Sequence, residues 1–209
     1  MADNGLKTIV DNKVRNYREL NRVALKHQTV LAGSSLMDYF PVNELLMNIS
    51  SDRKVYNRGI LSLTIAQYRE VIDVVTDLEP SRLFINIGTN DLTRGGDTIG
   101  NLIRNYRQLL VLIRERVPQC QITLMAYYPC REVTQPETRE GRIARTNENI
   151  RKANVEVAKL ADELGLGFID ITGPLYDDKG ELRQELCLDP VHFSAEGYIE
   201  VFGLLEKFL

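Results

Sequence analysis

The sequence predicts an α/β fold in which a parallel sheet of about five strands lies between two layers of helices. Short apolar segments alternate with longer segments of helical periodicity, and the apolar segments are hydrophobic on both faces. Strands of this kind are typical of parallel sheets that helices cover on both sides. The 209 residues contain no repeat and no low-complexity linker. We therefore expect a single domain over 1–209.

Five segments are expected to form strands, because each is short, apolar and followed by turn residues. They are 29–32, 55–57, 83–87, 121–125 and 167–170. The spacing of apolar residues predicts an N-terminal helical lead within 1–27 (helix 6–26) and further helices over 65–78, 98–116 and 143–164. Asp97 or Thr98 can cap the third of these helices, Gly165 ends the fourth, and Ser194 can cap a last helix.

Composition excludes several classes of function. A net charge of −3 gives no general attraction to nucleic acid or to an anionic membrane. The segment 1–13 has no apolar signal region, and no apolar run is long enough to span a membrane. The chain has three cysteines, which are scattered and lack any zinc-type spacing. This pattern predicts buried or free thiols and a cytoplasmic location.

Polar and glycine-containing segments follow the first three predicted strands. Ser34 and Ser35 follow the first strand, 57–59 ends the second, and 88–91 follows the third. Ligand sites in parallel sheets lie beyond the carboxyl ends of the strands, where the strand order reverses. These segments are therefore expected to meet at one site.

The chain has two histidines, and they differ in their predicted positions. His27 precedes the first strand, at the opposite end of the sheet from the polar segments. His192 stands at the start of the last helix, three residues after Asp189. A serine hydroxyl, a histidine base and a carboxylate are the groups that acyl transfer requires. Taken alone, the Asp-x-x-His spacing is more typical of a helix cap beside a surface histidine.

Four segments, in order, resemble the signature blocks of the SGNH (GDSL-like) hydrolases. They are Val30-Leu31-Ala32-Gly33-Ser34-Ser35, Asn57-Arg58-Gly59-Ile60, Gly88-Thr89-Asn90-Asp91 and Asp189-Pro190-Val191-His192-Phe193. The resemblance spans nearly the whole chain, from residue 29 to 198. Ser34 departs from the pattern, because the family usually has aspartate there. The register of the block places Ser35 at the position of the nucleophile.

The resemblance implies a flavodoxin-like domain that hydrolyses carboxylic esters without a metal or an organic cofactor. Ser35 would be the nucleophile, His192 the base and Asp189 the carboxylate that orients it. The backbone N–H groups of Ser35 and Gly59 and the side-chain amide of Asn90 would form the oxyanion hole. Size and block spacing are similar to the platelet-activating-factor acetylhydrolase-like branch of lipase-acylhydrolases. A small acyl group such as acetyl is therefore expected, and sugar deacetylation or thioester hydrolysis would use the same residues.

Three alternatives stay open at this level. Three arginines stand at three-residue spacing, Arg139, Arg142 and Arg145. This pattern indicates either a solvated helix face or a patch that binds a negatively charged substrate group. A non-catalytic module could bind an anionic ligand at Ser34-Ser35 and the Gly95-Gly96 loop. The N-terminal helix could also form a homodimer. The Gly-x-Ser-x-Gly turn of α/β-hydrolases is excluded, since Met37 occupies its last position.

Overall fold

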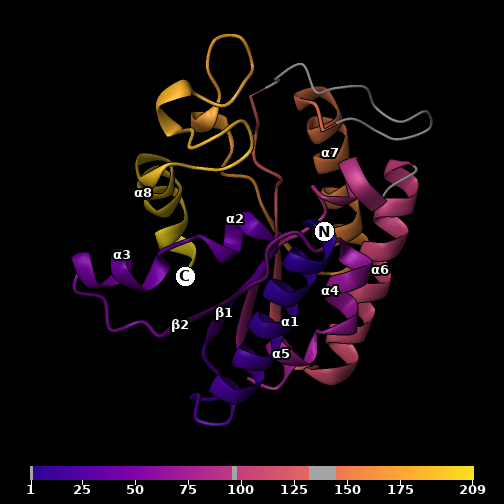
Figure 1. The fold of residues 1–209 in the computed structure, drawn as a ribbon, viewed down its shortest axis with the longest axis vertical. Helices are drawn as coiled ribbons and strands as arrows, with labels where there is room; N and C mark the ends of the chain where they lie inside the picture. Colours follow the sequence, from indigo (N-terminus) through magenta and orange to yellow (C-terminus); the bar gives the residue numbers. More distant parts are fainter. Residues whose placement is uncertain (1, 96–97, 132–144) are drawn as a thin grey trace.

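The chain forms a parallel sheet of five strands in the order β2-β1-β3-β4-β5 (Figure 1). This computed structural model describes residues 2–95, 98–131 and 145–209. The strands are β1 Thr29–Gly33, β2 Val55–Gly59, β3 Arg82–Asn86, β4 Gln121–Met125 and β5 Gly167–Ile169. Every neighbouring pair is parallel. The predicted parallel sheet is therefore confirmed.

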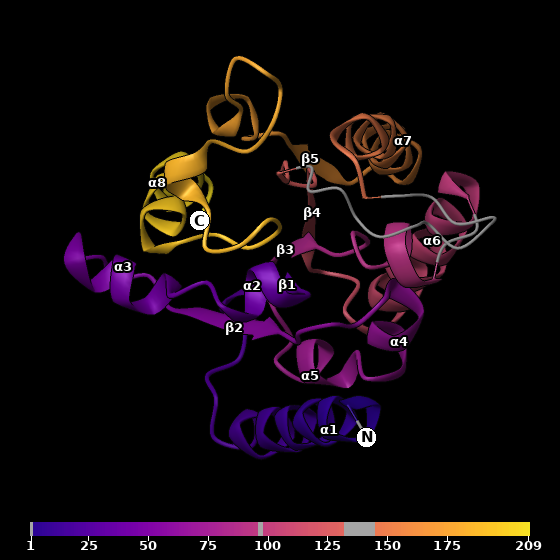
Figure 2. The ribbon, with the colours of Figure 1, turned by 45° about the horizontal axis from the view of Figure 1, so that its top comes forward.

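Helices cover both faces of this sheet (Figure 2). They are α1 Ala2–Asn21, α2 Ser35–Asp38, α3 Val42–Asn48, α4 Ile65–Glu70, α5 Asp73–Thr76, α6 Ile99–Arg116, α7 Asn147–Leu164 and α8 Ala195–Leu205. Val30 and Ala32 of β1 belong to the core under α1 and α4 to α7, whereas Leu31 belongs to the core under α2, α3 and α8. This alternation along one strand produces the predicted three layers.

The ends of the long helices follow local sequence signals. The side chains of Thr98 and Ser194 accept hydrogen bonds from the backbone and cap α6 and α8. Gly165 adopts a left-handed conformation, with φ of 64°, and ends α7 as predicted. Asp97, the other candidate cap, and residue 143, the predicted start of α7, lie outside the described residues.

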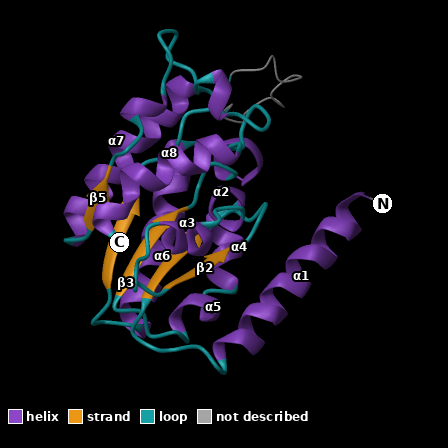
Figure 3. Cartoon of the chain, turned by 90° about the vertical axis from the view of Figure 1, so that its left-hand side faces the viewer, coloured by secondary structure: helices purple, strands orange, loops and turns teal. Residues whose placement is uncertain are grey.

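The predicted helix 65–78 is instead two short helices, α4 and α5. Arg18 of α1 bonds to Asp73 at 2.6 Å, and the Asn21 side chain donates to the carbonyl of Val74 at 2.9 Å. These contacts join α5 to α1, which runs along the outside of its layer (Figure 3). Periodicity within one segment cannot show such a contact.

Among the helices of the described residues, none combines the length and the hydrophobicity that a membrane span requires.

The strand order reverses between β1 and β3. The chain passes from β1 to β2 on one side and returns to β3 on the other side. In the register of the sheet, Gly33 at the end of β1 lies opposite Gly59 of β2 and Asn86 of β3. The loops that follow these three strands therefore leave the sheet at one level, where a ligand site is expected.

Candidate active site

The turn after β1 places Ser35 beyond the carboxyl end of the strand, as the first residue of α2. Gly33 makes this turn possible, because a Cβ at this position would lie 2.1 Å from the carbonyl oxygen of Asn86. Ser34 is buried, and its carbonyl oxygen accepts the N–H groups of Met37 and Asp38. Of the two serines, Ser35 is the one that lines the pocket described below.

The predicted serine, histidine and aspartate lie in hydrogen-bond contact. The Nε2 atom of His192 is 2.9 Å from Ser35 Oγ. Its Nδ1 atom is 2.7 Å from Asp189 Oδ2. The imidazole therefore bridges a hydroxyl and a carboxylate, which is the arrangement that a serine nucleophile needs for activation.

Backbone hydrogen bonds fix the loop that carries the histidine. The second carboxylate oxygen of Asp189 accepts the N–H groups of Val191 and His192, at 2.8 and 2.9 Å. The N–H of Leu188 donates to the His192 carbonyl, and the N–H of Arg131 donates to that of Pro190. Partial burial acts to raise the pKa of Asp189, but the hydrogen bonds from His192 and Val191 outweigh it, so this pKa lies below its ordinary value.

Aromatic packing joins the histidine loop to the helix of the nucleophile. Phe193 makes edge contacts with Tyr128 and Tyr198. The hydroxyl of Tyr198 in α8 donates to the carbonyl of Leu36 in α2 at 3.1 Å. The segments that carry Ser35 and His192, far apart in the sequence, are therefore joined by one packed cluster.

A pocket of about 330 Å³ opens above the serine. Its lining residues are Ser35, Tyr39, Leu61, Ser62, Asn90, Thr93, Arg145, Val191 and His192. Asn90 follows β3, and its side-chain amide donates to the carbonyl of Leu63 at 3.0 Å. Of the predicted oxyanion donors, Ser35 and Asn90 are thus brought together on the wall of one pocket.

The loop from Leu61 to Thr64 forms another wall and is held at both ends by carboxylates. The N–H of Leu61 donates to Asp38, and the N–H of Ile65 donates to Asp91. Between these contacts Ser62 has φ of 70°, a conformation that residues other than glycine seldom adopt. Ser62 could not be predicted as a pocket residue, because a serine carries no local signal for a positive φ.

Gly59, the third predicted oxyanion donor, is not brought to the pocket with Ser35 and Asn90. It ends β2 and is not among the residues that line the pocket. Its N–H donates to the side chain of Asn57 at 2.8 Å, so this donor is already engaged. A Cβ on Gly59 would lie 2.1 Å from the backbone nitrogen of Asp38. Glycine is therefore required here for the close packing of β2 against α2.

The chain matches a known protein family over most of its length. The model of the GDSL-like Lipase/Acylhydrolase family matches residues 38–198. The chain belongs to this family. Its members are carboxylic ester hydrolases, and the matched residues include Asn90, Asp189 and His192, whereas Ser35 lies just before them. A search of curated proteins found no match to the chain.

Solved structures of similar fold cover nearly the whole chain. A protein from Streptococcus pneumonia, described by the term platelet activating factor, is 23% identical, with a TM-score of 0.85 over 99% of this chain and 95% of its own. A GDSL-like lipase from Bacteroides thetaiotaomicron is 18% identical, with a TM-score of 0.75 over 93% and 96%. An acetylxylan esterase from Geobacillus stearothermophilus is 19% identical, with a TM-score of 0.64 over 88% and 94%. At these identities the likeness shows the shared fold.

Within this GDSL-like hydrolase fold, Arg145 is not part of a solvated helix face. Its residue is 8% exposed, and its side chain lines the pocket with Ser35 and His192. The solvated-face interpretation is therefore wrong for Arg145. Arg139 and Arg142, the other two members of the pattern, lie outside the described residues, as does Gly96 of the proposed anion-binding loop.

Asp91 is a buried carboxylate of this hydrolase, and burial raises its pKa from 3.8 to about 6. Since the pKa of Asp91 is higher in the folded chain than in the unfolded chain, its protonated form favours folding. This contribution to the free energy of unfolding is fully present below about pH 4 and is lost as the pH rises through about 6. Asp91→Asn keeps an oxygen for the Ile65 N–H without the buried charge. At about pH 8 it is expected to raise the free energy of unfolding by up to about 3 kcal/mol.

Urea unfolding of both proteins at about pH 4 and about pH 8 measures this effect. The wild type is expected to lose stability between the two conditions by more than Asp91→Asn does. Equal losses in the two proteins would show that Asp91 is charged at little cost in the folded state.

Proposed function

We propose that Ser35, His192 and Asp189 hydrolyse carboxylic esters with short acyl groups by a two-step, covalent mechanism. The observation that carries this proposal is the continuous hydrogen-bonded series from Asp189 through His192 to Ser35 Oγ. Ser35 and His192 line a pocket at the point where the strand order reverses, which is where open parallel sheets bind ligands.

In the first step, Ser35 Oγ attacks the carbonyl carbon of the ester and its proton passes to Nε2 of His192. The negative charge on the carbonyl oxygen is stabilised by the N–H of Ser35 and by the amide of Asn90. An amide has two N–H donors, so Asn90 can hold Leu63 with one and the oxyanion with the other. Gly59 is left out of this oxyanion hole, because its N–H donates to Asn57.

The intermediate then expels the alcohol oxygen, which takes the proton from His192 and leaves an ester between the acyl group and Ser35. In the second step, a water molecule gives a proton to Nε2 and attacks the acyl carbon. Expulsion of Ser35 Oγ, which recovers its proton from His192, releases the carboxylic acid. Asp189 holds the Nδ1–H throughout and stabilises the imidazolium that each step forms.

The preference for short acyl groups rests on the size of the pocket. Its volume of about 330 Å³ lies at the lower end of the range for small-molecule sites. The acyl group, the carbonyl and part of the alcohol have to share it. An acetylxylan esterase among the structural neighbours is named for an acetyl substrate, which supports the same interpretation.

Turnover of p-nitrophenyl esters with increasing acyl length tests this function. The purified chain is expected to hydrolyse the acetate with the highest kcat/KM and the octanoate with a much lower value. A fluorophosphonate is expected to stop this turnover and to label Ser35 in a peptide identified by mass spectrometry. A preference for octanoate would contradict the short-acyl assignment, and inhibition without a label on Ser35 would contradict the nucleophile.

A further inference from the structure

The guanidinium of Arg145 is buried beside the reacting groups. Arg145 is 8% exposed, and it lines the pocket together with Ser35 and His192. Its Nε and Nη2 atoms are buried and have no hydrogen-bond partner in the part of the chain that the structure describes. Buried polar atoms are nearly always hydrogen-bonded, so two unbonded donors on one cation require an explanation.

Burial of this charge is energetically costly. Burial lowers the pKa of Arg145, and the interactions with Cys130 and Asp189 oppose only part of this effect. Asp189 itself is hydrogen-bonded to His192, and no described residue lining the pocket carries a carboxylate. A buried cation normally has an anion beside it, because attraction to the anion offsets the lost hydration.

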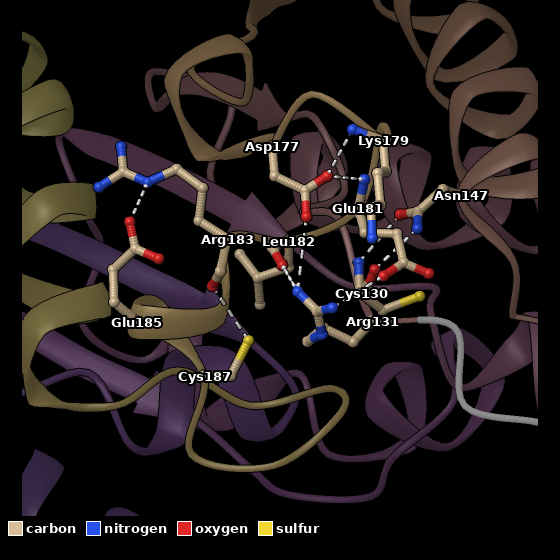
Figure 4. A network of polar contacts seen from close by, with 10 residues as sticks. All are labelled: Cys130, Arg131, Asn147, Asp177, Lys179, Glu181, Leu182, Arg183, Glu185 and Cys187. Atoms are coloured by element: carbon tan, nitrogen blue, oxygen red, sulfur yellow. Dashed lines mark hydrogen bonds and ion pairs between the residues drawn. The ribbon is translucent and has the colours of Figure 1, made fainter.

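Arg131 follows Cys130, the residue that contacts the Arg145 carbonyl, and its guanidinium has several partners (Figure 4). Its guanidinium lies 3.5 Å from Asp177 and 3.2 Å from Glu181, and it donates to the carbonyl of Leu182 at 2.9 Å. Among the described residues, the structure thus pairs one arginine with two carboxylates and gives the arginine of the pocket none. Carboxylates therefore offset the charge of Arg131, whereas the described residues that line the pocket offer Arg145 none.

The backbone of Arg145 is held in place. The Asn147 side chain accepts the N–H of Cys130 at 3.0 Å and donates to its carbonyl at 2.7 Å (Figure 4). The thiol of Cys130 in turn donates to the carbonyl of Arg145 at 3.5 Å. The start of α7 is therefore fixed to the segment that follows β4, and with it the backbone position from which the Arg145 side chain extends to the pocket.

We propose that Arg145 binds a negatively charged group of the ester substrate, a carboxylate or a phosphate. Arginine has five donors in a planar arrangement that fits two oxygens of such a group, and Nε and Nη2 form one edge of that arrangement. The proposal rests on the proposed function for the reaction and names the class of ester that the pocket selects. The anion completes the hydrogen bonding of Arg145 as the carbonyl meets Ser35.

Matched pairs of esters test this selectivity and locate the charge. In the first pair, mono-p-nitrophenyl succinate carries a carboxylate in its acyl group and p-nitrophenyl butyrate is the neutral match. In the second pair, p-acetoxybenzoate carries the carboxylate in its leaving group and phenyl acetate is the neutral match. The wild type is expected to prefer the anionic member of one pair. Arg145→Gln is expected to lower that preference, as a ratio of kcat/KM values, by about 10- to 100-fold.

Arg151→Gln is the matched control, because it removes the same charge from an exposed position on α7 that does not line the pocket. Its preference between the esters is expected to equal that of the wild type. Equal losses for the charged and neutral esters in Arg145→Gln would overturn the proposal, since a role in the oxyanion hole would affect both alike. The proposal would also be overturned if Arg145→Gln showed the same preference as the wild type in both pairs of esters.

Thermal unfolding with added succinate or inorganic phosphate tests the same site without turnover. Either anion is expected to raise the Tm of the wild type in a concentration-dependent manner and to raise that of Arg145→Gln less. Without anions, Arg145→Gln is expected to be at least as stable as the wild type, because an unpaired buried charge is removed. A lower Tm for Arg145→Gln without anions, or an equal response to them, would overturn the proposal. If the wild type hydrolyses none of the esters, the proposed function fails, and this measurement still decides the role of Arg145.

Discussion

Replacing Ser35 by alanine is expected to lower kcat for p-nitrophenyl acetate by at least about 10³-fold, because it removes the atom that forms the acyl-enzyme bond. In the structure this oxygen lies 2.9 Å from Nε2 of His192. Alanine leaves the imidazole without a hydroxyl proton to accept. The turnover that remains would come from water that attacks an ester held beside the same oxyanion donors.

Ser34→Ala is the natural control, since it removes a hydroxyl from the neighbouring residue. Ser34 is buried, does not line the pocket and joins α2 through its carbonyl oxygen, which alanine retains. We expect this variant to keep most of its turnover and its fluorophosphonate label on Ser35. If turnover survives Ser35→Ala and disappears in Ser34→Ala, the attacking oxygen is that of Ser34, and the register inferred from the motif is wrong. Circular dichroism of both variants controls for the fold.

The parts of the fold that could be predicted depend on local preferences of the backbone. The five strands are short and apolar, and Thr98, Gly165 and Ser194 mark helix ends through their own side chains or conformation. The break between α4 and α5 could not be predicted in this way. α5 contacts α1 through the bond from Arg18 to Asp73, two residues whose proximity arises only when α1 packs against the rest of the fold.

The same distinction applies to the site. Ser35, Asn90 and His192 each occupy a position next to a strand or a helix, so the order of the motifs indicates that they meet. Gly59 also has such a position, but a glycine there can either donate its N–H or allow close packing, and only the bond to Asn57 distinguishes the two. The burial of Arg145 could not be predicted, because arginines at helical spacing are typical of an exposed helix face. Its burial arises from tertiary contacts.

Asp189→Asn is expected to lower kcat by about 10²- to 10⁴-fold while the fold stays intact. The carboxylate accepts a proton from Nδ1 of His192 and so keeps the lone pair of Nε2 directed at Ser35. An asparagine can instead donate to Nδ1, which places the remaining ring proton on Nε2, where it cannot accept the serine proton. The amide of the variant would still offer an oxygen to the N–H groups of Val191 and His192, so the loop should hold.

Asp178→Asn removes the same charge from an exposed position and is expected to leave kcat unchanged. The side chain of Asp189 is 43% exposed, so water can replace part of its bond to the imidazole. A loss near the lower end of the range therefore indicates that water takes over part of this role. A kcat for Asp189→Asn equal to that of Asp178→Asn would mean that the 2.7 Å contact does not orient His192 during turnover. The histidine would then be positioned by the backbone bonds of its loop and by the aromatic cluster around Phe193.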